Sequence, residues 1–447
     1  MDLDLRLGER LLARTVTSSR GAKVRISYTE EIAEQYGAEA PLLSCSLPTP
    51  GPSEPVKARA FLEGLLPEGR ALAAAAAQIR GTKLDSDGAP ATPADTMLLL
   101  AEYGRDCAGA IVVVPAGAEP PGPGEYSEPL TDEQLASMIR NIPTRPLGAD
   151  PARGIRMSLA GAQDKLLLAR IHGTWREPLE GAPSTHIAKP TTTWPHSAEN
   201  EALVMHLGRI AGLTSHRVWV EKMGGTSVLI AERYDRRVDG DTIKRLHQED
   251  MCQANGIRPK HKYNIGRPSE NMAKLLRVWA DTPRQAIAEL FRQVAFRAIA
   301  GDEDGHGKNY SLLLDDGKVR LAPLYDSLCT LVYPDLDGKM AAPIGGQVNL
   351  AKVDRQALTD EGIAMGLTPA EVAEHLNSLS ADLRDGLNSM PPEITDGWPA
   401  EQVVGLINDR VKHLESGAPL GGTDDADRPG PTLDQATARR PRTTSQA

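Results

Sequence analysis

Three oxygen-bearing side chains, those of Asp304, Asn309 and Asp326, have the types and spacing that phosphoryl transfer requires. Asp304 and Asn309 lie five positions apart in a glycine-rich string, and Asp326 lies 17 positions further along. In such a reaction one carboxylate orients the attacking hydroxyl and accepts its proton, while an amide oxygen and a second carboxylate hold Mg²⁺ against the phosphates. The three residues are therefore candidates for a phosphoryl-transfer site.

The string around Asp304 also admits a simpler interpretation. Asp, Gly and Asn are common turn residues, so it could be an ordinary loop, with His306 as a structural hydrogen-bonding group and Lys308 as a solvated charge. Two observations favour function. The five-residue gap equals the Asp-to-Asn gap of the protein-kinase catalytic loop. Asp326 also lies among apolar residues, where a buried carboxylate needs a partner.

Candidates for phosphate binding lie upstream of this string. Residues 157–165, Met-Ser-Leu-Ala-Gly-Ala-Gln-Asp-Lys, include small side chains that let backbone N–H groups approach phosphate oxygens. The string matches neither a Walker A loop nor the glycine-rich kinase loop, so an ordinary turn is the alternative. Lys189 precedes a proline in a short strand, where its ammonium could reach the α- and β-phosphates, or could be a surface charge.

A hinge is the next candidate. The apolar strand that begins at Leu229 becomes polar at Glu232-Arg-Tyr-Asp-Arg. In a kinase, backbone groups at such a position contact adenine. An ordinary strand end with solvated charges is the alternative interpretation.

Strands and helices alternate around these residues. The patterns predict strands at 110–114, 165–171, 186–190 and 226–231, and helices at 56–80, 199–213 and 283–300. Thr131-Asp-Glu-Gln is typical of a capping box that opens a helix. A hairpin with an Asp316-Gly317 turn joins 310–314 to 319–324 and could return Asp326 to the metal. Residues 355–415 have a helical pattern.

Composition limits the class of protein. The 447 residues suffice for two or three domains, and 40% hydrophobic residues suffice for a sizeable core. The net charge of −10 argues against dedicated nucleic-acid binding by this chain alone. The four cysteines have no CxxC spacing, which argues against a zinc knuckle or a disulfide scaffold. With neither a signal peptide nor a membrane span in the pattern, we expect a cytoplasmic protein.

Read together, the motifs resemble the HipA family, the kinase halves of bacterial toxin–antitoxin pairs. The similarity runs in order through about residues 1–415. The matching strings are 43–48, 61–69 and 104–110, then 158–165, 185–190 with 199–201, 232–236, 246–253 and 262–263, and finally 304–309 and 324–326.

The resemblance implies an α+β, two-lobed, protein-kinase-like fold with an added N-terminal subdomain. The expected divisions are a subdomain at 1–116, a Pro/Gly-rich loop at 117–130, an N-lobe-like region at 131–236, a helical C-lobe at 237–416 and a disordered tail at 417–447.

The resemblance also assigns roles, with ATP and Mg²⁺ as cofactors. Asp304 would be the catalytic base, with Asn309 and Asp326 as Mg²⁺ ligands. The expected nucleotide-binding residues are Lys189, Glu232, Tyr234, Gln248, His306, Gly161, Ala162 and Gln163. Ser158 would be the autophosphorylated serine whose modification expels the phosphate loop. Asp302, where the family often has Asn, puts an extra carboxylate beside the base and could alter metal affinity.

Partners follow from the same resemblance. Family members phosphorylate serine or threonine on proteins, with aminoacyl-tRNA synthetases as targets. A HipB-like helix-turn-helix antitoxin neutralises them and carries the complex onto operator DNA, and no membrane is involved. Two other classes stay open: a small-molecule phosphotransferase with the same Asp and Asn/Asp groups, and a catalytically idle co-repressor partner of an antitoxin.

Overall fold

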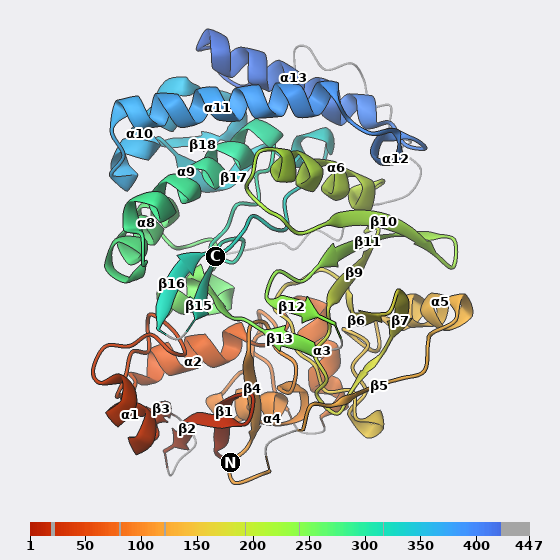
Figure 1. Ribbon diagram of the computed structural model, residues 1–447, viewed down its shortest axis with the longest axis vertical. Helices are drawn as coiled ribbons and strands as arrows, with labels where there is room; N and C mark the ends of the chain where they lie inside the picture. The colour runs from red at the N-terminus through yellow and green to blue at the C-terminus, as the bar shows by residue number, and fades with distance from the viewer. Residues whose placement is uncertain are drawn as a thin grey trace.

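The computed structural model describes residues 1–421, except 19–22, 80–81, 120–121, 193, 241 and 316. Figure 1 shows the strand-rich N-terminal half of the chain at the bottom and the long C-terminal helices at the top. No helix in the described part of the chain is long and apolar enough to cross a membrane. Residues 422–447, most of the tail predicted to be disordered, lie outside the described residues.

The N-terminal part is an antiparallel four-stranded sheet covered by helices. The strands follow the order β3 (Val24–Tyr28), β2 (Arg10–Thr17), β1 (Leu3–Leu7) and β4 (Ile111–Pro115). The helices are α1 (Glu30–Tyr36), α2 (Pro55–Gly64), α3 (Gly69–Gln78) and α4 (Pro93–Tyr103). The predicted helical region 56–80 is thus two helices, because the chain turns at Leu65–Glu68, around Pro67.

A second antiparallel sheet has one helix on each face. Its order is β10 (Val218–Met223), β11 (Thr226–Glu232), β9 (His186–Pro190), β6 (Leu166–Ile171) and β7 (Thr174–Arg176). Alternate strand residues point to opposite faces. Leu168 and Ile230 pack with Leu135 of α5 (Asp132–Asn141), whereas Leu229 packs with Ala202 of α6 (Ser197–Ile210). The predicted capping box of Thr131 and Gln134 opens α5.

Short strands join the sheets to the helical part. β12 (Arg236–Asp239) pairs with β13 (Thr242–Arg245), and β5 (Glu125–Tyr126) pairs with β8 (Pro178–Leu179). A three-stranded sheet contains β14 (His247–Asp250), β15 (Ser311–Asp315) and β16 (Lys318–Leu321), with α7 (Met251–Ala254) following β14. The predicted hairpin is confirmed as β15–β16, although its second strand ends at Leu321 and Asp316 lies outside the described residues.

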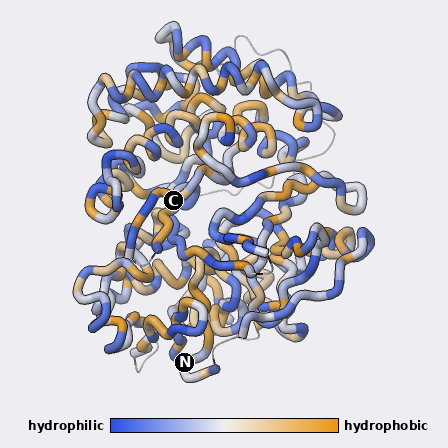
Figure 2. The backbone as a smooth tube through the Cα atoms, viewed as in Figure 1, coloured by the Kyte–Doolittle hydropathy of each residue, from blue (hydrophilic) through white to orange (hydrophobic). Residues whose placement is uncertain are grey.

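The C-terminal part is mostly helical. Its helices are α8 (Pro268–Trp279), α9 (Pro283–Ala300), α10 (Arg355–Met365), α11 (Pro369–Asn388), α12 (Pro392–Thr395) and α13 (Ala400–Ser416). Along these helices blue and orange segments alternate in Figure 2, as expected when one face of each helix is buried. The central helix α9 is buried along most of its length, with Phe291 and Phe296 in the core.

Two sequence predictions need correction here. The stretch 117–130 is not loop throughout, since it contains β5. Beyond the predicted β15–β16 hairpin, the mostly helical region 237–416 also contains β12 to β14 and the pair β17 (Lys339–Ile344) and β18 (Gln347–Asn349). The strands of these two stretches that were not predicted, β5, β12 to β14, β17 and β18, are two to six residues long, and runs this short seldom show a period that identifies them. The domain boundaries themselves stay a prediction.

Candidate functional site

The loop that carries Asp304 begins where α9 ends. Gly301 ends the helix in the left-handed conformation, with φ of 77°. The buried guanidinium of Arg297, in the last turn of α9, donates hydrogen bonds to the carbonyls of Asn309 (3.1 Å) and Tyr325 (2.6 Å). Asn309 Nδ2 donates to the carbonyl of Asp304 at 2.8 Å, which leaves its Oδ1 for a ligand. Arg297 therefore joins the loop to the segment that contains Asp326.

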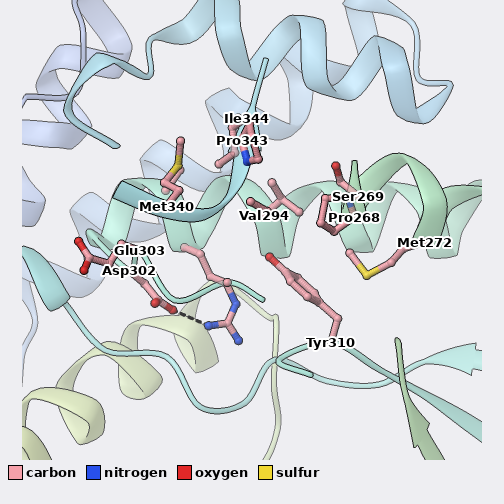
Figure 3. A pocket seen from close by; sticks show the side chains of 14 residues that line it. Pro268, Ser269, Met272, Val294, Asp302, Glu303, Tyr310, Met340, Pro343 and Ile344 are labelled. Carbon is pink, nitrogen blue, oxygen red and sulfur yellow. Dashed lines mark hydrogen bonds and ion pairs between the residues drawn. The ribbon is translucent and has the colours of Figure 1, made fainter. Parts of the chain in front are cut away.

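Asp302 does not act as a free carboxylate beside the base. Its side chain pairs with Arg297 Nη1, accepts a hydrogen bond from Ser327 Oγ at 2.7 Å and accepts the N–H of Asp304 at 3.0 Å. It borders a pocket of about 30 Å³ behind the loop, large enough only for water (Figure 3). With its oxygens engaged, Asp302 acts on the base through its charge and its hydrogen bond to the loop.

Lys189 joins two carboxylates from different parts of the chain. Its Nζ lies 2.7 Å from Glu201 Oε1 on α6 and is also hydrogen-bonded to Asp326 Oδ1. Burial would raise the pKa of Asp326, but the ammonium of Lys189 lowers it well below its usual value. Asp326 is thus ionised at neutral pH, and Lys189 is the partner that its apolar surroundings require.

The oxygens of Asp326 and Asn309 fit a magnesium ion. Mg²⁺ prefers oxygen ligands and is held in kinases by one or two protein side chains together with substrate phosphates. Asp326 keeps Oδ2 outside its pair with Lys189, and Asn309 keeps Oδ1. Asp326 has φ of 54°, a left-handed conformation that Asp tolerates better than most residues. The donor set therefore suits a metal that also contacts phosphate.

The predicted phosphate loop is attached to the N-terminal part of the chain. Ser158 is fully buried, its Oγ donates to the carbonyl of Leu65 at 2.6 Å, and its N–H donates to the carbonyl of Asp106 at 2.9 Å. The N–H of Glu68 donates to the carbonyl of Gly161 at 3.1 Å. Gly161 has φ of +115°, and an added Cβ would lie 2.4 Å from Lys165 Nζ, so the loop requires glycine there.

One cavity of about 480 Å³ brings the predicted site residues together. Its walls include Asp304, Asn309, Asp326, Lys189, Glu232, Tyr234, Gln248, His306, Gly161, Ala162 and Gln163. Ser158 does not line it, because its side chain points into the protein towards Leu65. The volume is within the range of small-molecule sites. At the hinge, the N–H groups of Glu232 and Arg233 are bonded to the carbonyls of Arg217 and Thr185, so neither is free for adenine.

The charged residues of the cavity wall that were not assigned a role from the sequence include Glu68, Lys165, Glu201, Asp250 and Lys262. Lys165 Nζ donates to the carbonyl of Ala160 at 2.9 Å, and burial and the nearby Lys189 lower its pKa to about 8. Glu201 could have been found as the acidic residue of the helix after the lysine strand. No sequence signal identified Glu68, because its partners Lys262 and Lys308 lie 194 and 240 positions further along the chain.

Lys308 is not a solvated charge. Its side chain is buried and forms an ion pair with Asp250 of β14. A second carboxylate oxygen, Glu68 Oε1, lies 3.8 Å from Lys308 Nζ. The two carboxylates raise the pKa of Lys308 despite burial, which would lower it. The residue is therefore a buried cation that joins the loop to β14.

Asp304 has the properties of a general base. Its carboxylate is half exposed at the cavity, and burial together with the charge of Asp302 raises its pKa to about 6. A base with a pKa near the working pH accepts a proton efficiently and remains mostly ionised at pH 7. With Lys189 and the oxygens of Asn309 and Asp326 on the same cavity, the site can position a hydroxyl against a phosphate.

Comparisons with family models, with curated proteins and with solved structures all find similarity to the same family. A model described as the HipA N-terminal domain matches residues 3–114, and one described as the HipA-like C-terminal domain matches residues 157–387. "Putative kinase Y4mE" of Sinorhizobium fredii is 40% identical over 321 residues, which are 70% of this chain and 74% of that protein. "Serine/threonine-protein kinase toxin HipA" of Shewanella oneidensis is 28% identical over 359 residues, or 77% and 78% of the two chains.

A solved structure confirms the predicted fold class. The chain resembles one from the complex of HipA, HipB and operator DNA of Shewanella oneidensis with a TM-score of 0.75 and 23% identity, over 93% of this chain and 97% of that chain. The fold is therefore the α+β, kinase-like fold with an N-terminal subdomain.

Proposed function

This chain belongs to the HipA family of kinases, and we propose that it is an ATP- and Mg²⁺-dependent serine/threonine protein kinase of the toxin type. The observation that carries the proposal is the meeting of Asp304, Asn309, Asp326 and Lys189 on one cavity of about 480 Å³. These residues come from β9, the loop after α9 and the segment after β16. A purely structural role would not require this set.

The proposed reaction depends mainly on positioning. Lys189 binds the α- and β-phosphates, and the backbone of residues 161–163 covers the triphosphate. Bound Mg²⁺ would neutralise charge that develops on the phosphates. Asp304 accepts the proton of the acceptor hydroxyl as its oxygen attacks the γ-phosphorus, and ADP leaves with the electrons of the broken P–O bond. Tyr234 and Gln248, hydrogen-bonded to each other, form the wall on the adenine side.

Autophosphorylation of Ser158 would switch this kinase off. The buried Oγ, bonded to the carbonyl of Leu65, has no space for a phosphate group of nearly two negative charges. The loop must therefore leave its position before Ser158 can be modified, and it cannot return afterwards. Displacement of the loop removes Gly161, Ala162 and Gln163 from the cavity wall and with them part of the nucleotide site.

The substrate and partners are inferred from relatives. The kinship with the serine/threonine-protein kinase toxin of Shewanella oneidensis supports a serine or threonine of a protein as acceptor. The resemblance to the HipA family leads us to propose a protein of the translation machinery, of the aminoacyl-tRNA synthetase class, as that acceptor. The structure that contains HipA, HipB and operator DNA supports a helix-turn-helix antitoxin as partner and contact with DNA mainly through it. These assignments imply a cytoplasmic protein.

Labelling with ATP tests the proposal. We expect the purified chain, incubated with labelled ATP and Mg²⁺, to incorporate phosphate on Ser158. Asp304→Ala should abolish labelling, whereas Asp360→Ala, an exposed carboxylate on α10, should not change it. Equal melting temperatures would show that both variants fold.

Two results would contradict this function. Transfer to a small hydroxylated metabolite and to no protein would identify a small-molecule phosphotransferase. Absence of any transfer, with operator repression retained by an Asp304→Ala, Asp326→Ala double variant, would identify an inactive co-repressor.

A further inference from the structure

Tyr263 contacts the carboxylate of Asp304 directly. The tyrosine follows the short 3-10 helix η2 (Pro259–His261) and lies at the cavity, where its Oη donates a hydrogen bond to Asp304 Oδ1 at 3.2 Å. Burial and the negative charge of Asp304 raise the pKa of Tyr263, so its hydroxyl keeps the proton at neutral pH. The contact is therefore a hydrogen bond from a neutral donor to an ionised acceptor, and at 3.2 Å it is longer than such bonds usually are.

The other oxygen of Asp304 remains available. His306 Nε2 lies 3.9 Å from Asp304 Oδ2, beyond hydrogen-bond distance. A carboxylate has about four lone-pair positions, so one oxygen can hold Tyr263 while the other accepts a proton. Without a partner on Oδ1, the half-exposed side chain would rotate among several orientations.

Tyr263 is 54% exposed and has contacts with both His306 and Lys262. Its ring meets the edge of the His306 ring at 5.2 Å between centroids, with an interplanar angle of 72°. Lys262 Nζ lies 5.4 Å from the centre of the Tyr263 ring and 3.1 Å from Glu68 Oε2. The carbonyl of Lys262 accepts the N–H of Gly307 at 3.5 Å. The tyrosine is thus held by the catalytic loop and, through Lys262, by the N-terminal part of the chain.

We propose that Tyr263 is a positioning residue that holds Asp304 through Oδ1 so that Oδ2 faces the acceptor hydroxyl. The inference rests on the proposed function of Asp304 as the base. In many active sites a third group orients the base in this way. Loss of the hydrogen bond leaves the cavity and the nucleotide contacts in place and affects the turnover step.

The test uses Tyr263→Phe, which removes only the hydroxyl. We expect kcat for phosphoryl transfer to fall about 10-fold, with the KM of ATP and of the protein acceptor unchanged. Calorimetric binding of a non-hydrolysable ATP analogue should also be unchanged. Tyr126→Phe is the matched control, because its hydroxyl donates to the carbonyl of Pro183 at 3.0 Å, away from the cavity.

A double-variant cycle separates positioning from a general structural effect. If Tyr263 acts through Asp304, the Phe substitution should not lower the residual rate of Asp304→Asn any further. An equal loss in both backgrounds, or a raised acceptor KM with unchanged kcat, would overturn the inference. Wild-type kcat in Tyr263→Phe, with Asp304→Asn impaired, would also overturn it and leave the proposed function intact. An inactive wild type would instead contradict the proposed function.

Discussion

Lys189 shows how single residues connect the site. It is buried, and two carboxylates raise its pKa above the ordinary value although burial alone would lower it. One carboxylate, Glu201, lies on α6, and the other, Asp326, follows β16. A cation between α6 and the segment after β16 sets the distance between them, since an unpaired partner would leave a buried charge. The arrangement therefore positions Asp326 at the cavity.

Glu249 offers a test of buried charge away from the reaction. It is fully buried on β14, one oxygen accepts the N–H of Cys45 at 2.7 Å, and burial raises its pKa to about 7 from 4.5. The folded state thus keeps a proton that the unfolded state loses above pH 4.5. The stability that this group contributes is present at low pH and is lost as pH rises through 7.

We expect Glu249→Gln to remove the loss of stability that Glu249 causes as pH rises. Relative to wild type, the free energy of unfolding of the variant should rise by about 2 kcal/mol between pH 5 and pH 8, from the size of the pKa shift. Urea unfolding at the two pH values measures it. The control is Glu128→Gln at an exposed position, whose difference from wild type should not depend on pH. A pH-independent difference for Glu249→Gln would contradict the prediction.

Helix α9 depends on the glycine that ends it. Gly301 has φ of +77°, and an added Cβ would lie 3.0 Å from Cys329 Sγ and 3.3 Å from a methyl carbon of Leu331. Gly417 ends α13 with φ of +78° and has no neighbour within 4 Å of such a Cβ. The two positions thus share a conformation and differ in packing.

We expect Gly301→Ala to cost more than Gly417→Ala. The control should lose about 1 kcal/mol of unfolding free energy, the cost of a left-handed non-glycine residue. Gly301→Ala should lose about 1–3 kcal/mol more through overpacking and should lower kinase activity, because the loop with Asp304 starts there. Chemical denaturation and labelling with ATP measure the two effects, and equal stability losses would contradict the packing argument.

Local signals explain which elements could be predicted. The β15–β16 hairpin and the cap of α5 depend on residues close together in sequence, so the pattern contains them. The strands β5 and β8 have only two residues each, and their pairing depends on contacts across more than 50 positions. Such pairings depend on tertiary packing and leave no periodic pattern.

The site also contains residues that local sequence reveals and residues that only long-range contacts reveal. Asp304 and Asn309 are recognisable because their spacing is local, and Asp326 because a hairpin returns it. Glu68 and Tyr263 act through long-range contacts, with Lys262 and Asp304 respectively. Their residue types are ordinary, so only the three-dimensional structure reveals the contacts.

The molecule as a whole assembles the cavity from distant segments. Glu68, in the N-terminal part, forms an ion pair with Lys262. The same part of the chain is hydrogen-bonded to Ser158 and Gly161 of the predicted phosphate loop. Asp106, also in the N-terminal part, forms ion pairs with the hinge and with β13. Its carboxylate oxygens lie 3.5 Å from the guanidinium of Arg233, 3.0 Å from that of Arg236 and 3.0 Å from that of Arg245. The nucleotide site and the N-terminal part should therefore unfold together.

The Asp106 network gives the prediction for the whole molecule. Burial would raise the pKa of Asp106, but the three guanidinium groups lower it well below its usual value, so its stabilisation is present at neutral pH and lost in acid. Asp106→Ala leaves buried arginines without their common partner and should lower the unfolding free energy by about 3–5 kcal/mol. The adjacent control, Arg105→Ala, breaks a partly exposed pair with Glu180 and should cost less than about 1 kcal/mol. Urea unfolding followed by tryptophan fluorescence and by loss of ATP-analogue binding should give coincident transitions in the wild type and in Arg105→Ala. Similar losses of unfolding free energy for the two variants, or separate transitions in the wild type, would mean that the network does not couple the N-terminal part to the hinge.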